Sequence, residues 1–388
     1  MFILEEPYVS DFLAQRAREL GLPVLDTPMA RKALGPDAAL TPGPEFARLA
    51  RAAGSPAVYA NSENAIPFVE TELAGTDLPR SIASFKDKVA FRELLRPLYP
   101  DFAFTGATLQ GLDAVDLNAL PKPFIIKPAV GFMSLGVRKV MDEAQWPDTV
   151  RAIRAEAAAV KGMFPDQVLN TGRFVLEACI PGQEFAVDAY FDDAGRPVIL
   201  NVLAHHFASA ADVSDRAYVT SGQIIRQWRG PMLEVLAELG ERAGLRRFPV
   251  HAELRADESG RLHFIEVNPM RFAGWCCTDI AYYAYGIDPY GHFMAQTEPD
   301  WDQVLSAHAG KAYGLVVAEI DPAVDRSTIR SVDWDGFGAL FAEPLQIRPV
   351  DYHRYSVFAF VFTQMDAADQ SELTRVLQAD LKPFLDLG

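Results

Sequence analysis

The feature that most constrains the fold is a pair of apolar segments, residues 248–254 and 262–267, joined by a polar turn at residues 256–261. Two such segments separated by Asp, Ser and Gly predict an antiparallel β-hairpin. Successive side chains point to opposite faces of a strand, so every second residue shares a face. One face then carries His251, Glu253 and Arg255 from the first strand, and Phe264, Glu266 and Asn268 from the second.

This shared face predicts a metal site. Two carboxylates, Glu253 and Glu266, and the amide of Asn268 repel one another there unless they are protonated or neutralised. Oxygen ligands of this kind suit Mg²⁺ or Mn²⁺ that bridges nucleotide phosphates. A solvated polar face is the alternative for Glu253 alone. It explains Glu266 less well, because Glu266 lies in an apolar strand where an unpaired carboxylate is costly.

The first part of the chain alternates strand, helix and strand. Residues 2–4 and 57–60 predict strands, and Ser10 and Gly21 are the expected ends of a helix between them. This alternation predicts a small parallel α/β unit. Ser81 is then expected to cap a helix that carries Lys86, Asp87 and Lys88, and a later helix is expected over residues 231–243.

A glycine-bearing loop at residues 131–136 follows the apolar strand that contains Lys127. The glycine spacing is that of a phosphate-binding P-loop, but Val137 and Arg138 stand where that motif requires Lys and Ser or Thr. The position between two strands instead predicts a hairpin whose backbone N–H groups fold over phosphates while Lys127 supplies charge. An ordinary flexible hairpin beside a lysine is the alternative.

Two glutamates flank a predicted hinge between strands. Glu177 ends the apolar segment 174–177, and Glu184 begins the next strand after a Pro-Gly pair. A hinge of this type exposes backbone N–H and C=O groups beside apolar side chains, which can bind an adenine ring. Each glutamate by itself is better explained as an exposed carboxylate near a turn.

Composition restricts the class of protein. A length of 388 residues predicts two or three domains. With 36 Lys and Arg against 52 Asp and Glu, the net charge of −16 argues against general binding to nucleic acid or an anionic membrane. No uncharged apolar run reaches the roughly 18–20 residues needed to span a bilayer. Three cysteines without metal-type spacing, and an amino terminus unlike a signal peptide, predict a cytoplasmic protein.

The order of these motifs resembles the ATP-grasp superfamily over residues 81–275, about half of the chain. The matching elements, in chain order, are Asp87-Lys88, the segment 125–128 with Lys127, the loop 131–136, Glu177 and then Glu184, Glu253, and Glu266-Val267-Asn268-Pro269. The resemblance implies α/β and α+β architecture. An N-terminal Rossmann-like α/β domain at residues 1–80 precedes the ATP-grasp nucleotide- and metal-binding region at 81–310, and a small C-terminal α+β subdomain follows at 311–388.

The resemblance also implies roles for individual residues. Lys88 and Lys127 contact the ATP phosphates, and the loop with Gly131, Ser134 and Gly136 acts as a lid. Glu177 and the backbone of Ala178 and Ile180 meet adenine, and Glu184 takes the ribose hydroxyls. Two Mg²⁺ (or Mn²⁺) ions are held by Glu253, Glu266 and Asn268.

The activity implied is an ATP-dependent, ADP-forming ligase that joins a small-molecule carboxylate to an amine through an acyl phosphate. Arg271 and Lys127 are the expected catalytic residues. In many members of the family the arginine directly follows the Asn-Pro pair, whereas here Met270 separates Arg271 from it. An ATP-grasp kinase, a carboxylate–thiol ligase and a non-catalytic nucleotide-binding regulator are the alternatives. The resemblance leaves open the acid, the amine, whether the chain forms a homodimer, and the roles of His205, His206 and His251.

Overall fold

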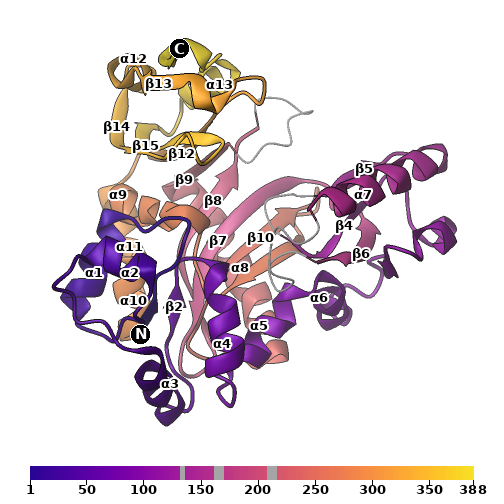
Figure 1. Ribbon diagram of the computed structural model, residues 1–388, viewed down its shortest axis with the longest axis horizontal. Helices are drawn as coiled ribbons and strands as arrows, with labels where there is room; N and C mark the ends of the chain where they lie inside the picture. Colours follow the sequence, from indigo (N-terminus) through magenta and orange to yellow (C-terminus); the bar gives the residue numbers. More distant parts are fainter. Residues whose placement is uncertain (132–135, 161–169, 208–215) are drawn as a thin grey trace.

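The structure, a computed structural model, describes residues 1–131, 136–160, 170–207 and 216–388. Its centre is an eight-stranded antiparallel sheet with the strand order β11-β10-β7-β8-β9-β12-β15-β14 (Figure 1). The strands are β7 (Gln183–Phe191), β8 (Pro197–His205), β9 (Ala217–Ser221), β10 (Phe248–Ala256), β11 (Leu262–Pro269), β12 (Lys311–Glu319), β14 (Glu343–Pro349) and β15 (Val357–Asp366). The long helix α8 (Gly222–Ala243) packs against β8.

The amino-terminal part forms the expected small parallel α/β unit, in which β1 pairs with β2 in parallel. Its elements are β1 (Phe2–Ile3), α1 (Asp11–Leu20), α2 (Pro28–Leu34), α3 (Gly43–Ala52), β2 (Tyr59–Ala60), a 3₁₀ turn (Glu63–Ala65) and α4 (Ile66–Glu72). Helix α1 begins and ends as predicted, since the Ser10 side chain accepts a hydrogen bond from the Leu13 N–H and Gly21 is left-handed. Apolar side chains of this unit and of the large sheet form one continuous core, which fixes the unit against the sheet.

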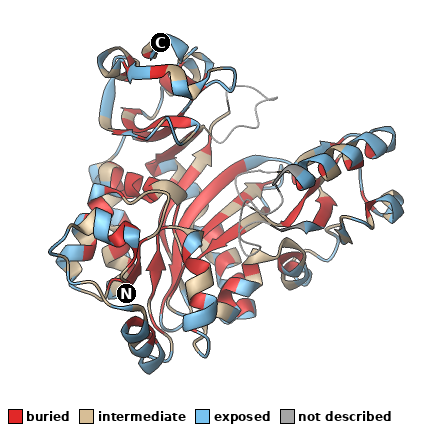
Figure 2. Ribbon diagram, viewed as in Figure 1, coloured by how far each residue is buried: buried red, intermediate tan, exposed pale blue. Residues whose placement is uncertain are grey.

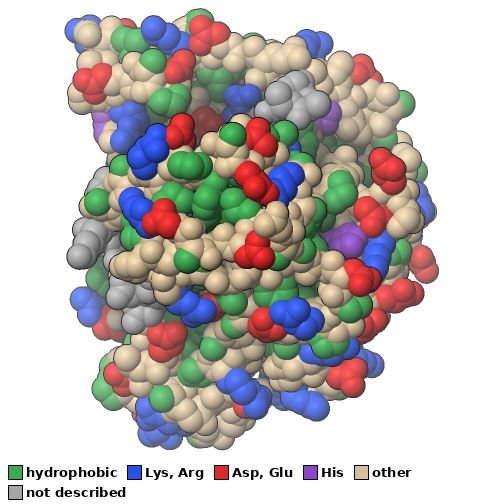
Figure 3. Space-filling model, turned by 90° about the vertical axis from the view of Figure 1, so that its right-hand side faces the viewer, with side chains coloured by type: hydrophobic (Ala, Val, Ile, Leu, Met, Phe, Trp, Pro, Cys, Tyr) green, Lys and Arg blue, Asp and Glu red, His purple; other side chains and the backbone are tan. Residues whose placement is uncertain are grey.

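A separate lobe projects from the large sheet, on the right in Figure 1. Its four strands have the order β3-β6-β4-β5 and comprise β3 (Phe104–Thr108), β4 (Phe124–Val130), β5 (Arg138–Val140) and β6 (Asn170–Ala178). Helix α7 (Trp146–Val160) lies on this sheet, and the lobe has its own apolar core around Phe124, Trp146 and Leu176. Seen from this end, acidic and basic side chains surround a group of hydrophobic ones (Figure 3).

The carboxy-terminal part adds β12, β14 and β15 to the large sheet, so the sheet crosses the domain boundary expected at residue 310. The remaining elements are α9 (Ile280–Tyr285), α10 (Pro289–Ala295), α11 (Trp301–Ala307), β13 (Ile329–Val332), α12 (Trp334–Gly338), α13 (Ser371–Gln378) and β16 (Leu385–Leu387). Figure 2 shows burial concentrated along the central strands. In the ranges that the structure describes, none of the helices combines the length and apolar character needed to cross a membrane.

The helix expected to start at Ser81 is in fact two helices, α5 (Leu78–Lys86) and α6 (Lys88–Leu95). Ser81 is buried inside α5 and caps nothing. The break lies at Asp87, whose backbone is extended and whose Oδ1 accepts hydrogen bonds from the N–H groups of Val89 and Ala90 at 2.9 and 3.0 Å. A strong N-cap therefore begins a second helix and makes Lys88 its first residue.

The helix predicted over residues 231–243 was also placed too late, because α8 already begins at Gly222. The Ser221 side chain caps it by accepting from the Ile224 N–H, and Ile225 is buried one turn later. Pro231 lies inside this helix rather than in its first turn. Capping and burial of the first turns outweigh the helix-breaking tendency of the proline.

Candidate active site

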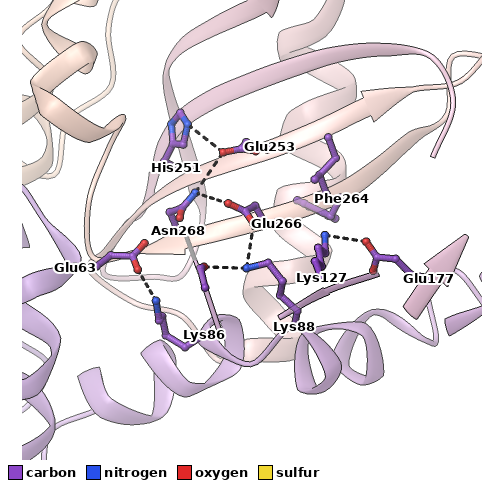
Figure 4. Close-up of polar contacts among 12 residues, drawn as sticks. Glu63, Lys86, Lys88, Lys127, Glu177, His251, Glu253, Phe264, Glu266 and Asn268 are labelled. Carbon is purple, nitrogen blue, oxygen red and sulfur yellow. Dashed lines mark hydrogen bonds and ion pairs between the residues drawn. The ribbon is translucent and has the colours of Figure 1, made fainter. Parts of the chain in front are cut away.

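The predicted hairpin is confirmed, and its polar face lies where the lobe meets the large sheet. Strands β10 and β11 pair antiparallel, with Glu253 opposite Glu266 and His251 opposite Asn268. The Asn268 amide nitrogen lies 3.5 Å from Oε1 of Glu253 and 3.5 Å from Oε1 of Glu266 (Figure 4). The three predicted metal ligands therefore converge on one place.

Lys88 faces these carboxylates from the amino end of α6. Its Nζ lies 3.2 Å from Oε2 of Glu266 and donates to the Gly131 carbonyl at 3.2 Å. Burial alone raises the pKa of Glu266, but Lys88, Lys127 and Arg271 outweigh it and hold that pKa at about 2. The pKa of Lys88 is lowered by burial, yet the charge of Glu266 raises it overall. Both groups are therefore ionised at neutral pH.

Lys127 lies in a separate buried cluster, across the site from Lys88 and the carboxylates of β10 and β11. It lies on β4, and its Nζ is 2.8 Å from Oε1 of Glu177, at the end of β6. Arg92 of α6 contacts the same carboxylate with Nε at 2.6 Å and Nη2 at 3.1 Å. Burial raises the pKa of Glu177, but Arg92 and Lys127 bring it down to about 2, whereas burial lowers the pKa of Lys127.

Sequence reasoning missed Arg92. It is 3% exposed, and its remaining donors reach the carbonyls of Phe264 at 2.8 Å and Ile265 at 2.9 Å on β11. The pairing of β10 with β11 is irregular beside these carbonyls, between Glu253 and Leu254. The only signal in the sequence is an arginine among apolar residues of a predicted helix, which marks a buried charge that needs a partner.

The Glu184 carboxylate, expected beside the ribose, contacts two side chains of the protein. Its Oε2 accepts from Arg255 Nε and Nη2 at 2.9 and 2.7 Å, and its Oε1 lies 3.2 Å from Nδ1 of His205. Burial raises the pKa of Glu184, and the contacts with His205 and Arg255 lower it overall. Arg255 also donates to the Ile180 carbonyl at 2.8 Å and so fixes the hinge that was expected to meet adenine.

The Glu177 side chain, expected near adenine, instead points to Lys127 and Arg92. The backbone of Ala178 is engaged as well, since its N–H donates to the Ala103 carbonyl at 2.9 Å. Ser134 and most of the expected lid loop lie outside the described residues. At the end of that loop Gly136 has a φ of +72°, and a Cβ there would lie 3.2 Å from the Pro128 ring.

Arg271 lies beyond the predicted metal ligands and contacts a residue from the amino-terminal unit. Its Nε and Nη2 are 3.3 and 3.2 Å from Oε1 of Glu63, and Lys86 Nζ is 2.5 Å from the other oxygen of that carboxylate. Burial raises the pKa of Glu63, but Lys86 and Arg271 lower it overall. A cavity at this position is lined by Glu63, Lys86, Lys88, Gly131, Glu266 and Asn268. Sequence reasoning also missed Glu63, which is distant in sequence from the other site residues.

The position of the His251 ring is fixed by the fully buried carboxylate of Asp188. Its Nδ1 lies 2.8 Å from Oδ1 of Asp188, and the same oxygen accepts from the Ala273 N–H at 2.8 Å. Its Nε2 is 3.8 Å from Oε1 of Glu253. Of the two remaining unassigned histidines, His205 contacts Glu184, and His206 contacts the Thr374 hydroxyl at 3.0 Å, in the carboxy-terminal part.

The donor set fits a hard divalent cation. Glu253, Glu266 and Asn268 lie together, the last two line the cavity, and nearby cations keep Glu266 ionised. Among the described residues, no group of three or more His, Cys, Asp and Glu is arranged to hold a metal by itself. Such a site needs further oxygen ligands, which nucleotide phosphates supply.

Residues 120–279 match the family model of the ATP-grasp domain. No curated protein matches the sequence. Among solved structures, an L-amino acid ligase from Bacillus licheniformis is 18% identical, with a TM-score of 0.69 and coverage of 100% of this chain and 98% of that one.

Two further solved structures are similar over the full length of this chain. A biotin carboxylase from Campylobacter jejuni is 13% identical with a TM-score of 0.64, and 92% of its chain is covered. An N5-carboxyaminoimidazole ribonucleotide synthetase from Thermotoga maritima is 11% identical with a TM-score of 0.65, and 98% of its chain is covered. At these identities the likeness establishes the fold. The chain therefore has the ATP-grasp fold, and its residues 120–279 match the model of the ATP-grasp domain.

Proposed function

We propose that the protein is an ATP-dependent carboxylate–amine ligase that forms an amide or peptide bond and releases ADP and phosphate. The observation that carries this proposal is the contact of Lys88 with Glu266 at 3.2 Å, beside Glu253 and Asn268. A cation for a polyphosphate, Lys88, and two oxygen-bearing side chains for a divalent ion, Glu266 and Asn268, therefore line one cavity. The similar L-amino acid ligase supports the choice of reaction class.

In the proposed reaction, a carboxylate oxygen of the acid attacks the γ-phosphorus of ATP, and the bond to the ADP oxygen breaks. The amine then attacks the acyl carbon, a C–N bond forms, the C–O bond to phosphate breaks, and the amine loses a proton. Phosphoryl transfer of this kind depends mainly on positioning and charge stabilisation, and needs no covalent intermediate with the protein.

The protein residues have separate tasks. Lys127 and Lys88 bind the phosphates, the hinge at Ala178 and Ile180 holds adenine, and Glu184 lies beside the ribose. Glu253, Glu266 and Asn268 would hold Mg²⁺, which supplies positive charge for the transferred phosphoryl group. Arg271 orients the acid, since a guanidinium offers two parallel N–H groups to a carboxylate. Gly131, Ser134 and Gly136 belong to the loop proposed to exclude water.

The test is nucleotide release with purified protein, Mg²⁺ and a panel of amino acids, given singly and in pairs. The proposal expects ADP and phosphate in equal amounts only when an acid and an amine are both present. With an acid and hydroxylamine it also expects a hydroxamate, which reports the acyl phosphate. ADP release with a single hydroxyl substrate would indicate a kinase, and a thioester product would indicate a carboxylate–thiol ligase. ATP binding without turnover under any mixture would favour a regulatory protein.

A further inference from the structure

We propose that Arg92 is a positioning residue that allows Lys127 to exchange Glu177 for an ATP phosphate. The proposal rests on the proposed function only in taking Lys127 as a phosphate-binding residue. Arg92 touches neither the cavity edge nor the metal ligands directly. It acts through Glu177 and through the backbone of β11.

The guanidinium of Arg92 makes a bidentate contact with the carboxylate of Glu177. Arg92 Nε and Nη2 contact both oxygens of Glu177, at 2.6 and 3.1 Å, whereas Lys127 reaches only Oε1, at 2.8 Å. A two-point contact fixes the orientation of a carboxylate, and a single ammonium contact does not. Glu177 is thus held by Arg92, and the contact of Lys127 is the one that can be exchanged.

The charges lead to the same conclusion. Arg92, Glu177 and Lys127 are each at most 6% exposed, and together they carry one negative and two positive charges. If Arg92 were absent, Lys127 and Glu177 would form a buried one-to-one pair. Moving the ammonium to a phosphate would then leave a buried carboxylate without a partner, which is costly. With Arg92 in place, Glu177 keeps a cation when Lys127 turns to the nucleotide.

Arg92 also links the two halves of the site. Lys88 and Arg92 are four residues apart on α6, so they lie on the same side of that helix. Lys88 contacts Glu266, while Arg92 contacts Glu177 and donates to the carbonyls of Phe264 and Ile265, directly before Glu266. Helix α6 therefore fixes the position of Lys127 on β4 relative to Glu266 on β11.

The apolar part of this environment accepts methionine, because Arg92 packs against Phe91 and Phe102 with its guanidinium carbon 5.6 and 5.1 Å from the ring centroids. Methionine alone would leave Glu177 and the carbonyls of Phe264 and Ile265 without these donors, whereas Arg92→Met with Glu177→Gln removes the buried charges together. Replacing buried ion pairs by apolar side chains of similar volume is often neutral for stability. The charge is retained, on this account, because it balances Glu177 during nucleotide binding.

The experiment uses calorimetry to measure the dissociation constant of a non-hydrolysable ATP analogue in the presence of Mg²⁺. Acid and amine are left out. The experiment compares wild type with Arg92→Met, Glu177→Gln and the double variant. Arg92→Met is expected to weaken binding about tenfold or more, as for a lost charged contact. The double variant is expected to recover to within about threefold of wild type, because no carboxylate then retains Lys127. A structural role predicts the opposite, a double variant at least as weak as Arg92→Met, and that result would overturn the proposal.

Two variants complete the design. Arg96→Met, at an exposed arginine directly after the end of α6, is the matched control and is expected to bind as wild type does. If Arg92→Met fails to fold, Glu177→Gln alone decides: binding at least as tight as wild type supports the proposal, and weaker binding contradicts it. Wild-type protein that binds no nucleotide would refute the proposed function, whereas normal wild-type binding without recovery in the double variant would refute only the role of Arg92.

Discussion

The two sides of the site hold their charges differently. On the lysine side, formed by Arg92, Glu177 and Lys127, the shortest contact of each cation with Glu177 is 2.6 or 2.8 Å, and the side chains are at most 8% exposed. On the carboxylate side, formed by Lys88, Glu253, Glu266 and Asn268, contacts are 3.2 to 3.5 Å, and the two glutamates are 25–27% exposed. The lysine side is therefore already organised without a ligand, and the carboxylate side keeps weaker contacts that a metal and phosphates can replace.

Glu266→Gln should show the largest effect, because it removes a ligand charge from the carboxylate side. Turnover is expected to fall about a thousandfold, since loss of charge stabilisation at a phosphoryl group acts directly on the transition state. The midpoint of thermal unfolding should fall by only a few degrees, because the side chain is partly exposed and its contact with Lys88 is long. Glu258→Gln, in the exposed turn of the same hairpin, is the control. Near-normal turnover in Glu266→Gln would reduce the carboxylate side to a polar surface.

Arg271→Lys tests whether the neighbouring guanidinium acts on the acid. The contacts of Arg271 with Glu63 are 3.2 and 3.3 Å, so this side chain too is held loosely enough to take a substrate. Turnover at saturating ATP is expected to drop roughly ten- to a hundredfold, because a point charge does not orient a carboxylate as a planar fork does. Affinity for ATP should change little. Unaltered steady-state kinetics for the acid would place Arg271 outside the site.

The buried carboxylate of the lysine side should make the stability of the protein depend on pH in acid. The pKa of Glu177 is depressed from 4.5 to about 2 in the folded protein, so between these values the unfolded chain binds more protons. The contribution of Glu177 to stability is therefore fully present above about pH 5 and is lost as the pH falls toward 2. Between pH 5 and 3, the free energy of unfolding of wild type should fall by about 1–2 kcal/mol more than that of Glu177→Gln. The free energies of unfolding are measured by chemical denaturation at each pH. An equal dependence on pH in the two proteins would show that the buried carboxylate contributes nothing to stability.

Lys88→Met should give the smallest effect. The substitution should strengthen the binding of a metal ion alone and weaken the binding of nucleotide. Without nucleotide, the ammonium competes with a divalent ion for Glu266, so its removal is expected to tighten Mn²⁺ binding several-fold, as seen by electron paramagnetic resonance. With the ATP analogue present, the same variant should bind nucleotide more weakly, because a phosphate contact is lost. Lys139→Met, an exposed lysine on β5, is the control. Weaker Mn²⁺ binding without nucleotide would mean that Lys88 supports the carboxylate side instead of competing for it.

The two sides also differ in how far the sequence predicts them. Glu253 and Glu266 follow from local alternation within one hairpin, and the register confirms that they lie opposite each other. The contact of Arg92 with Glu177 spans 85 residues and that of Arg271 with Glu63 spans 208, so local patterns do not reveal them. The two-helix arrangement at Asp87 was missed because one side-chain cap decided it. The contacts of Glu177 with Arg92 and Lys127 were not predicted for the same reason, since a buried carboxylate takes the cations that the tertiary fold supplies.

The most direct test of the central claim is isotope transfer from the acid to phosphate. Once the panel has identified an acid and an amine, the acid is labelled with ¹⁸O in its carboxylate, and the products are analysed by mass spectrometry. Activation as an acyl phosphate predicts one ¹⁸O atom in each phosphate released and none in ADP, with turnover reduced in Glu266→Gln and Arg271→Lys to the extents given above. Phosphate without ¹⁸O, or the label in AMP, would contradict the claim that this site transfers a phosphoryl group to a carboxylate.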